Sequence, residues 1–227
     1  MMPKRTLLLG VLGAAFGSSS ALAEEAPQPE KIRWGMGAKV RRWYAPPLLQ
    51  QLFVEDSPGL ASNDGAGLDF ARRTGNVEVA FGFGFDRLDG RDGYYVEKGG
   101  DPTVPGNVDY VTFHDLQWFT AEVTVASHAR IHKFLEFRYG AGLGLGLVRG
   151  EMRKTDSLCT SDRLAQDCMP DPAGVEVDQP ADIPPVLPVV NVLLGMQLVP
   201  FDFLHLHVDI GFHSVPYVGA GATLYLW

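Results

Sequence analysis

The stretch that decides the fold is residues 77–88, Val-Glu-Val-Ala-Phe-Gly-Phe-Gly-Phe-Asp-Arg-Leu. Valine or phenylalanine stands at every second position, and the residues between them are charged or small. A period of two predicts a β-strand with one large apolar face and one polar or small face. Residues 135–148, Leu-Glu-Phe-Arg-Tyr-Gly-Ala-Gly-Leu-Gly-Leu-Gly-Leu-Val, repeat this pattern with glycines on the second face.

The same period extends over six further segments, which brings the number of predicted strands to eight. These segments are residues 32–44, 65–73, 110–126, 189–199, 204–213 and 217–227. The connections between strands alternate in length along most of the chain. Short ones are residues 74–76, 127–134, 200–203 and 214–216, and long ones are residues 45–62, 89–108 and 150–185. This alternation is typical of transmembrane barrels, in which short turns lie on one side of the membrane and long loops on the other.

Alternation alone would also fit a soluble β-sandwich. A sandwich, however, would turn the large apolar face inward and leave glycine-rich rows in water. In a barrel that crosses a membrane, the apolar face meets lipid and small residues leave room in a narrow lumen. We therefore predict an all-β fold, a closed antiparallel up-and-down eight-stranded transmembrane β-barrel.

The N-terminus indicates export. Lys4 and Arg5 precede a short apolar run, and Ala21-Leu22-Ala23 is a small-x-small cleavage site. This order predicts a signal peptide over residues 1–23 and a barrel domain over residues 24–227, with a buried N-terminal helix as the alternative. The mature chain carries a net charge of −10, which argues against nucleic acid as a partner.

The chain resembles the small outer-membrane β-barrels of the OmpA/OmpX shape. More narrowly, it resembles uncharacterised bacterial barrels with a Tyr-Gly-Ala-Gly-Leu-Gly-Leu-Gly stretch, here residues 139–146. The resemblance implies location in the outer membrane, contact with its lipids and lipopolysaccharide, and insertion by the barrel-assembly machinery, which reads a C-terminal aromatic residue. Trp227, with Tyr225 two positions before it, fits that signal. The signal should turn both residues toward lipid, and with them Gly219 and Gly221, whereas other strands place their glycines inside. The orientation of the last strand stays open.

Ten charged residues fall on the predicted lumen face. They are Arg33, Lys39, Arg41, Asp69, Glu78, Asp86, Glu122, Glu136, Arg138 and Asp209. Unpaired charge in a closed interior is costly, so we expect these residues to form ion pairs that plug the lumen. The alternative is a polar path for a small solute. Eight strands enclose little more than their own side chains, which favours the plug.

Two cysteines, Cys159 and Cys168, lie in the third long connection. Export favours oxidation, so we predict that they form a disulfide. A metal site there would need further ligands, and only carboxylates are nearby. The three long connections carry net charges of −2, −2 and −5, which suits solvated loops. The alternative is that acidic residues in 150–185 bind divalent cations among lipopolysaccharide phosphates, or repel anionic partners.

Three further features of the sequence bear on function. His205, His207, Asp209 and His213 share one strand face, but neighbours on that face are about 7 Å apart, so a shared metal would need help from another strand. His213-Ser214 prompts comparison with the lipid A deacylase barrel, yet that enzyme's His-x-Ser-Asn arrangement is absent and adjacent strand residues point to opposite faces. Residues 46–53 predict a short helix over the barrel mouth, or alternatively on the lipid surface or against a partner.

We therefore expect an integral outer-membrane barrel with a structural or surface-interaction role, without catalysis, metal or cofactor. The surface partner is not specified by the sequence. The alternatives are a narrow pore for ions or small solutes and a lipid-modifying enzyme.

Overall fold

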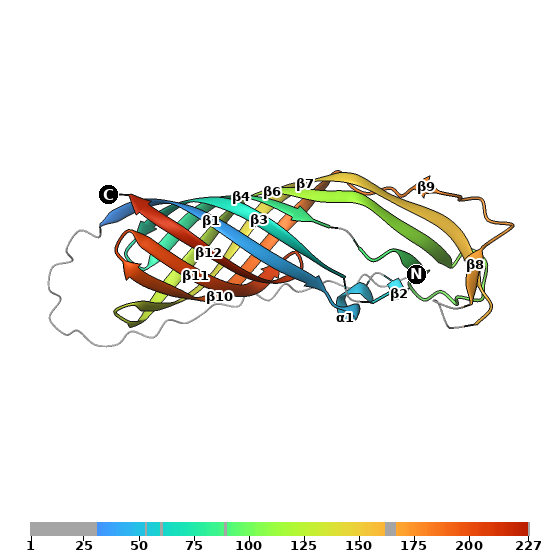
Figure 1. Ribbon diagram of the computed structural model, residues 1–227, viewed down its shortest axis with the longest axis horizontal. Coiled ribbons are helices and arrows are strands. Elements are labelled where there is room, and N and C mark those ends of the chain that lie inside the picture. Colours follow the sequence, from blue (N-terminus) through green and yellow to red (C-terminus); the bar gives the residue numbers. More distant parts are fainter. Residues whose placement is uncertain (1–30, 53, 60, 89, 162–166, 227) are drawn as a thin grey trace, which may run out of the picture. The chain divides into compact units, whose positions relative to one another are not determined.

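A computed structural model describes residues 31–226 except residues 53, 60, 89 and 162–166. Within this part of the chain, eight strands close into one antiparallel barrel (Figure 1). In barrel order they are β1 (Ile32–Ala45), β3 (Ala61–Thr74), β4 (Val77–Arg87), β6 (Val108–His132), β7 (Leu135–Cys159), β10 (Val186–Phe201), β11 (Leu204–His213) and β12 (Pro216–Leu226). The barrel is closed because β1 pairs with β3 on one side and with β12 on the other. The predicted signal peptide, residues 1–23, lies outside the described residues.

The two faces of the barrel wall differ as the period of two predicts. The outer face is apolar, and many of its large side chains are exposed, among them Leu143, with a relative exposure of 70%, and Val40, with 62%. The inner face carries buried arginine, glutamate, aspartate and histidine. This distribution of polar and apolar side chains is the reverse of that in a soluble protein. It is stable only where the outer face meets lipid. Closure also leaves the wall without an unpaired edge, as a lipid environment requires.

The two rims of the barrel are different. At one, here called the terminal rim, β1 begins, β12 ends, and tight turns at residues 75–76, 133–134 and 202–203 join neighbouring strands. The opposite rim, here called the loop rim, carries the long connections and one short turn at residues 214–215. Short and long connections therefore segregate to opposite rims, as the sequence indicated.

The longest strands, β6 and β7, continue beyond the ends of their neighbours at the loop rim (Figure 1). Their outer parts join β2 (Val54–Asp56), β5 (Gly93–Glu97), β8 (Cys168–Pro170) and β9 (Gln179–Pro180) in a small sheet, here called the distal sheet. The predicted strand end at residue 148 was therefore wrong, and residues 150–159 are strand and not loop. The predicted end at residue 126 was also wrong, because β6 continues to His132 at the terminal rim. A register shift between His114 and Gln117 marks the boundary, where Asp115 and Gly150 both have positive φ.

The distal sheet has a small apolar core of its own. Val96, Val108 and Cys159 are buried in it, and Tyr94 and Cys168 pack against them. The Cys159–Cys168 disulfide joins β7 to β8. The Tyr94 hydroxyl donates a 3.0 Å hydrogen bond to the Cys168 carbonyl, so β5 is also fastened to β8 beside the disulfide.

The first connection differs from expectation. Its helix α1 (Pro47–Gln50) is the one helix of the described residues, and it is shorter than the predicted 46–53, of which Phe53 lies outside the described residues. Leu48 and Leu52 are 75% and 66% exposed, so they do not pack over the barrel mouth. The Gln50 amide instead fastens the connection by donating to the carbonyls of Ala45 and Gly59. No described helix has the length and apolar character that crossing a membrane would require.

We predict that replacing both cysteines by serine loosens the distal sheet and leaves the barrel folded. The closed loop is short, so the lost stabilisation should be about 2–3 kcal/mol and confined to the distal sheet. Limited proteolysis should cut within residues 160–185 faster in the variant, while the wild-type and variant barrels should unfold at the same denaturant concentration. A fall in the unfolding midpoint of the barrel itself would contradict this.

Candidate functional site

The lumen is filled by a network of polar side chains that runs from rim to rim. Near the terminal rim, Arg73 Nη2 lies 2.9 Å from Glu136 Oε2. The buried His128 ring lies between two carboxylates, 3.4 Å from Glu78 and 3.5 Å from Glu136. The Gln197 amide donates to Glu136 at 2.9 Å, so this carboxylate has partners from three other strands.

Two cations connect the middle of the network. Lys39 Nζ lies 2.9 Å from Asp69 and 3.0 Å from Glu122. Arg138 lies 3.7 Å from Glu78 and 3.4 Å from Asp209, which links the central layer to the terminal rim. Each cation is shared between two carboxylates on different strands.

The layer at the loop rim is built around a buried ion pair. The Arg41 guanidinium makes a bidentate ion pair with Asp86, and both residues are buried. The His213 ring stacks obliquely near Trp118 and lies 3.4 Å from Glu122. These contacts close the interior below the distal sheet.

Glycines on the inner face make room for these side chains. A Cβ at Gly146 would lie 1.9 Å from the Trp118 indole nitrogen, and a Cβ at Gly65 would lie 1.9 Å from Asp86 Oδ1. At these positions any larger residue would collide with the network. The inward glycine rows therefore serve to admit large polar side chains, and the space they leave is occupied.

The structure brings nine of the ten predicted lumen charges into ion pairs with one another or with neighbours. The exception among the described residues is Arg33, which donates to the Asp202 carbonyl at 3.2 Å and lies over the Tyr225 ring at the terminal rim. The prediction missed Arg73, although it has the same parity as Asp69 on β3. It also missed His128, which belongs to the part of β6 that was assigned to a turn.

The last strand has one clear orientation. Tyr225 is 3% exposed and points into the lumen, where its hydroxyl donates to Glu78. Gly219 and Gly221 also face inward, and the His207 ring fills the space beside Gly221. The expectation that Tyr225 faces lipid was therefore wrong, because its hydroxyl donates a hydrogen bond to the buried carboxylate of Glu78. Trp227 lies outside the described residues, so its role as an assembly signal stays a prediction.

The space left in the lumen is small. A cavity of about 40 Å³ lies among Lys39, Asp69, Arg138, His207 and Asp209. This is the volume of very few water molecules. The cavity is lined by charged and polar side chains and is much smaller than a sugar.

The geometry of His213 and Ser214 does not form a nucleophile and base. His213 is buried in the lumen, whereas the Ser214 hydroxyl accepts from the Val190 amide and donates to the Pro188 carbonyl of β10. The other histidines of this strand are engaged separately. His205 Nδ1 lies 3.0 Å from the Gln197 amide, and His207 Nε2 lies 3.6 Å from Asp209.

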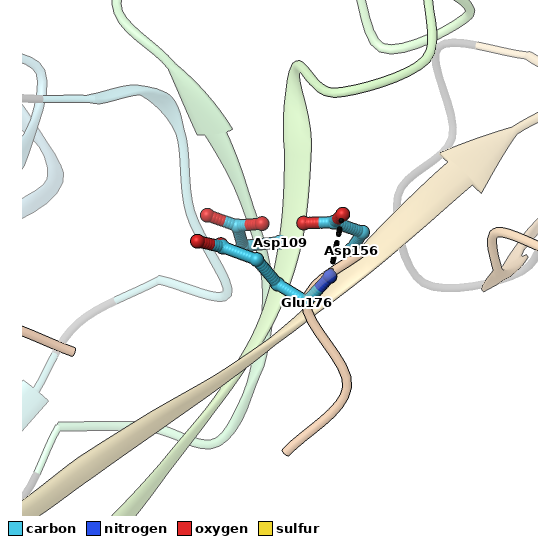
Figure 2. Close-up of side chains that lie close together, drawn as sticks. All are labelled: Asp109, Asp156 and Glu176. Atoms are coloured by element: carbon cyan, nitrogen blue, oxygen red, sulfur yellow. Dashed lines mark hydrogen bonds between the residues drawn. The ribbon is translucent and has the colours of Figure 1, made fainter. Parts of the chain in front are cut away.

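A second polar cluster lies in the distal sheet, outside the barrel wall. Asp109 of β6, Asp156 of β7 and Glu176 bring their carboxylates within 4.8 Å of one another (Figure 2). This arrangement unites two of the acidic residues of the third long connection with one from β6.

A lysine and two backbone amides of the protein itself compensate the negative charge of this cluster. Lys154 makes an ion pair with Glu176 and lies 4.0 Å from Asp109. The hydrogen bond with Glu176 raises the pKa of Lys154. Asp156 accepts from the backbone amides of Val175 and Glu176, at 2.9 and 3.0 Å. Burial raises the pKa of Asp109, which Lys154 opposes. The cluster therefore fastens residues 175–176 to β7.

We predict that Arg41→Met and Arg42→Met differ sharply although the residues are adjacent. Arg41 removal leaves Asp86 buried without its cation, which should cost about 3–5 kcal/mol of unfolding free energy. Arg42 makes a bidentate pair with Asp64, but both side chains are exposed, so its loss should change stability little. Urea unfolding in lipid vesicles, followed by tryptophan fluorescence, measures both. Equal effects would contradict the assignment of Arg41 to a closed interior.

We predict that Lys154→Met releases residues 171–185 from the distal sheet at neutral pH. Without the cation, three neighbouring carboxylates repel one another, and this repulsion raises their pKa values. Release should therefore be strongest above those pKa values and diminish as the pH falls through them. Limited proteolysis at neutral and mildly acidic pH measures this. Lys98→Met, which removes an exposed pair with Glu55, is the matched control and should show no such change.

A closed antiparallel barrel with an apolar outside and a polar inside is the architecture of outer-membrane β-barrel proteins, and the chain is located accordingly in the outer membrane. No protein-family model and no curated protein sequence matches the chain.

Solved structures match it in fold. The crystal structure of Neisserial surface protein A aligns with 86% of this chain and 99% of its own, at 11% identity and a TM-score of 0.44. The crystal structure of Ail, the attachment invasion locus protein of Yersinia pestis, aligns with 88% of this chain and 100% of its own, at 12% identity and a TM-score of 0.46.

Proposed function

We propose that this protein is an outer-membrane barrel that holds the distal sheet at the cell surface for contact with an external partner, and that it neither conducts solutes nor catalyses a reaction. The observation that carries the proposal is the continuity of β6 and β7. Both run without interruption from the barrel wall into the distal sheet, each over 25 residues. A pore needs no such extension, and an enzyme of the outer leaflet needs a reactive pair at the wall.

The orientation in the membrane follows from export. Both ends of the barrel lie at the terminal rim, so that rim faces the periplasm and the loop rim faces outward. The distal sheet then stands beyond the lipid on the outside. The protein also contacts outer-membrane lipids, lipopolysaccharide and, through Trp227, the barrel-assembly machinery.

The distal sheet has the features of a contact surface. An open groove of about 590 Å³ lies between β5, β6 and β7, lined by apolar residues such as Tyr95, Phe113 and Met152 and by charges of both signs, Glu97 and Lys98. Aromatic side chains with a polar border are typical of protein interfaces. The disulfide, and the ion pairs of Lys154 with Glu176 and Asp109, keep this surface rigid. A rigid surface loses less conformational entropy when it binds a partner.

The proposal is tested by deleting the protein and comparing surface adhesion, envelope permeability and lipid A composition. Adhesion should fall on deletion and return with the wild-type chain but not with Tyr95→Ser/Phe113→Ser, which alters the groove. Permeability and lipid A acylation should not change. A matched control, Phe81→Ser/Phe83→Ser on the outer barrel face, should instead reduce the amount of inserted protein. Loss of small-solute uptake with unchanged adhesion would favour the pore, and altered acylation would favour the enzyme.

We predict that the purified barrel is closed to solutes of sugar size. The lumen is filled from Arg73 near the terminal rim to Trp118 near the loop rim, and its cavity of about 40 Å³ cannot hold a sugar. Liposomes containing the barrel should not swell in small sugars, beside liposomes with a general porin as the positive control. Swelling at the rate of the porin would show an open channel. Loss of that swelling on replacing Glu122 or Arg138 would then identify its lining.

A further inference from the structure

The mouth of the lumen at the terminal rim contains a pocket that the ion-pair network leaves open. It lies between the turn that joins β6 to β7 and the turn that joins β10 to β11, and its volume is about 190 Å³. It shares no lining residue with the central cavity of about 40 Å³. A space of this size holds several water molecules, which a small ligand can replace.

Three cations border this pocket. They are Arg33 on β1, Arg130 on β6 and Lys133 in the turn between β6 and β7. Arg33 donates to the Asp202 carbonyl at 3.2 Å, and Lys133 Nζ lies 4.7 Å from the centre of the Phe134 ring. Among the described residues, neither Arg33 nor Lys133 has an ion-pair partner. Both charges are therefore available to an anion that enters the pocket.

The acidic side chains at this mouth do not balance the cations. Glu136 lies 3.8 Å from Arg130, but Arg73 is closer to it, at 2.9 Å. That leaves Asp202 as the one remaining carboxylate of the described lining, against three cations. Arg33 is also paired in register with Arg73, and like charges opposite each other in a sheet repel. An anion in the pocket would relieve this repulsion.

The His205 side chain of β11 adds an unpaired donor to the lining. His205 is 1% exposed, and its Nδ1 lies 3.0 Å from the Gln197 amide nitrogen and 3.4 Å from Arg73 Nη1. Arginine nitrogens can only donate, so Nδ1 is the acceptor and the ring proton is on Nε2. This N–H has no hydrogen-bond partner among the described residues. Because a buried unpaired donor is costly, it indicates an acceptor that the protein does not itself supply.

We infer that this pocket is a binding site for a small organic carboxylate. Guanidinium groups bind carboxylates in bidentate geometry, and the Lys133 ammonium and the His205 N–H supply further donors. Much of the remaining wall is apolar, formed in part by Phe134, Val199 and Phe201, and it would contact the carbon atoms that carry the carboxylate. Inorganic phosphate has no such atoms, so it should bind less well.

The inference goes beyond the proposed surface role, because this pocket lies at the rim opposite the distal sheet. With the terminal rim facing the periplasm, as proposed above, the ligand comes from that compartment. Two sources carry the same chemistry there, a free organic acid and the C-terminal carboxylate of a peptide. Its donors come from β1, β6 and β11 and from the β6–β7 turn, so a bound carboxylate would join these elements at the mouth.

The test is calorimetric titration of the full, folded chain in neutral detergent with succinate and with the dipeptide acetyl-Ala-Ala. At least one of these carboxylates should bind saturably. Arg130→Gln/Lys133→Gln should weaken that binding by roughly tenfold or more, because a hydrogen bond to a charged group contributes about that factor. The matched control is Arg72→Gln/Lys98→Gln, which removes two exposed cations outside the pocket and should leave the affinity unchanged.

The role of His205 is tested separately. His205→Asn keeps an oxygen near the Nδ1 position for Gln197 and Arg73, and it has no donor at the Nε2 position. Binding should weaken, while the urea midpoint of unfolding stays near that of the wild-type chain. In the wild-type chain, the NMR signal of the His205 Nε2 proton should shift on saturation with the carboxylate, a readout that does not depend on the folding of any variant.

The remaining arms identify the source of the carboxylate and remove a competitor. Binding of succinate alone indicates a free organic acid, and binding of acetyl-Ala-Ala but not of its C-terminal amide indicates a chain end. Glu24→Gln/Glu25→Gln/Glu30→Gln removes the carboxylates that this chain itself carries before β1, so it should bind at least as tightly as the wild-type chain.

Four outcomes would each overturn the assignment. They are no binding by either the wild-type chain or the triple glutamine variant, equal losses in the two double variants, an unmoved His205 signal, and equal binding of inorganic phosphate. Adhesion measurements do not enter this test, so the surface role and the carboxylate site can fail independently.

Discussion

Charge pairing inside a narrow lumen is the constraint on which the rest of this structure depends. Eight strands leave space for side chains and little else, so a charge that enters the interior must find its counter-charge on another strand. Arg138 meets this requirement by reaching Glu78 on β4 and Asp209 on β11, and Lys39 meets it by reaching Asp69 on β3 and Glu122 on β6. These cross-lumen contacts also fix strand register, because a shift by one residue would turn every charge toward lipid.

The distal sheet is subject to a different constraint. Beyond the loop rim neither face of β6 and β7 meets lipid, so strict alternation is no longer required and charges appear on both sides, beside a small buried core. The change of register at Asp115 and Gly150 separates the two regimes. The same two strands therefore contact lipid on the barrel side of this point and solvent on the distal side. The small apolar core of the distal sheet is supplemented by the disulfide and by the ion pair of Lys154 with Glu176.

Sequence reasoning succeeded where the period of two was enforced by lipid, and failed where it was not. The inward parity of Lys39, Glu122 and Arg138 could be predicted because their neighbours are large and apolar. Residues 150–159 read as loop because their charges lie on both faces. Arg73 was missed at the end of its predicted strand, and the orientation of Tyr225 depended on Glu78, which is far away in the sequence. β5 pairs with β6, and β8 pairs with β7. These pairings likewise depend on tertiary contacts that the local sequence pattern does not indicate.

The ladder between β1 and β12 has a consequence for how the molecule is assembled. Its partners are the first and the last strands of the barrel, so Trp34 pairs with Leu226 only when the entire chain is available. Every other pair in the wall joins barrel strands that follow one another along the chain, through a tight turn or one of the long connections, so each closes a much smaller loop than this ladder does. The seam must therefore close last. Until it does, two edges with unpaired amides and carbonyls are exposed, and these are the edges that a folding catalyst or a misfolded neighbour would engage.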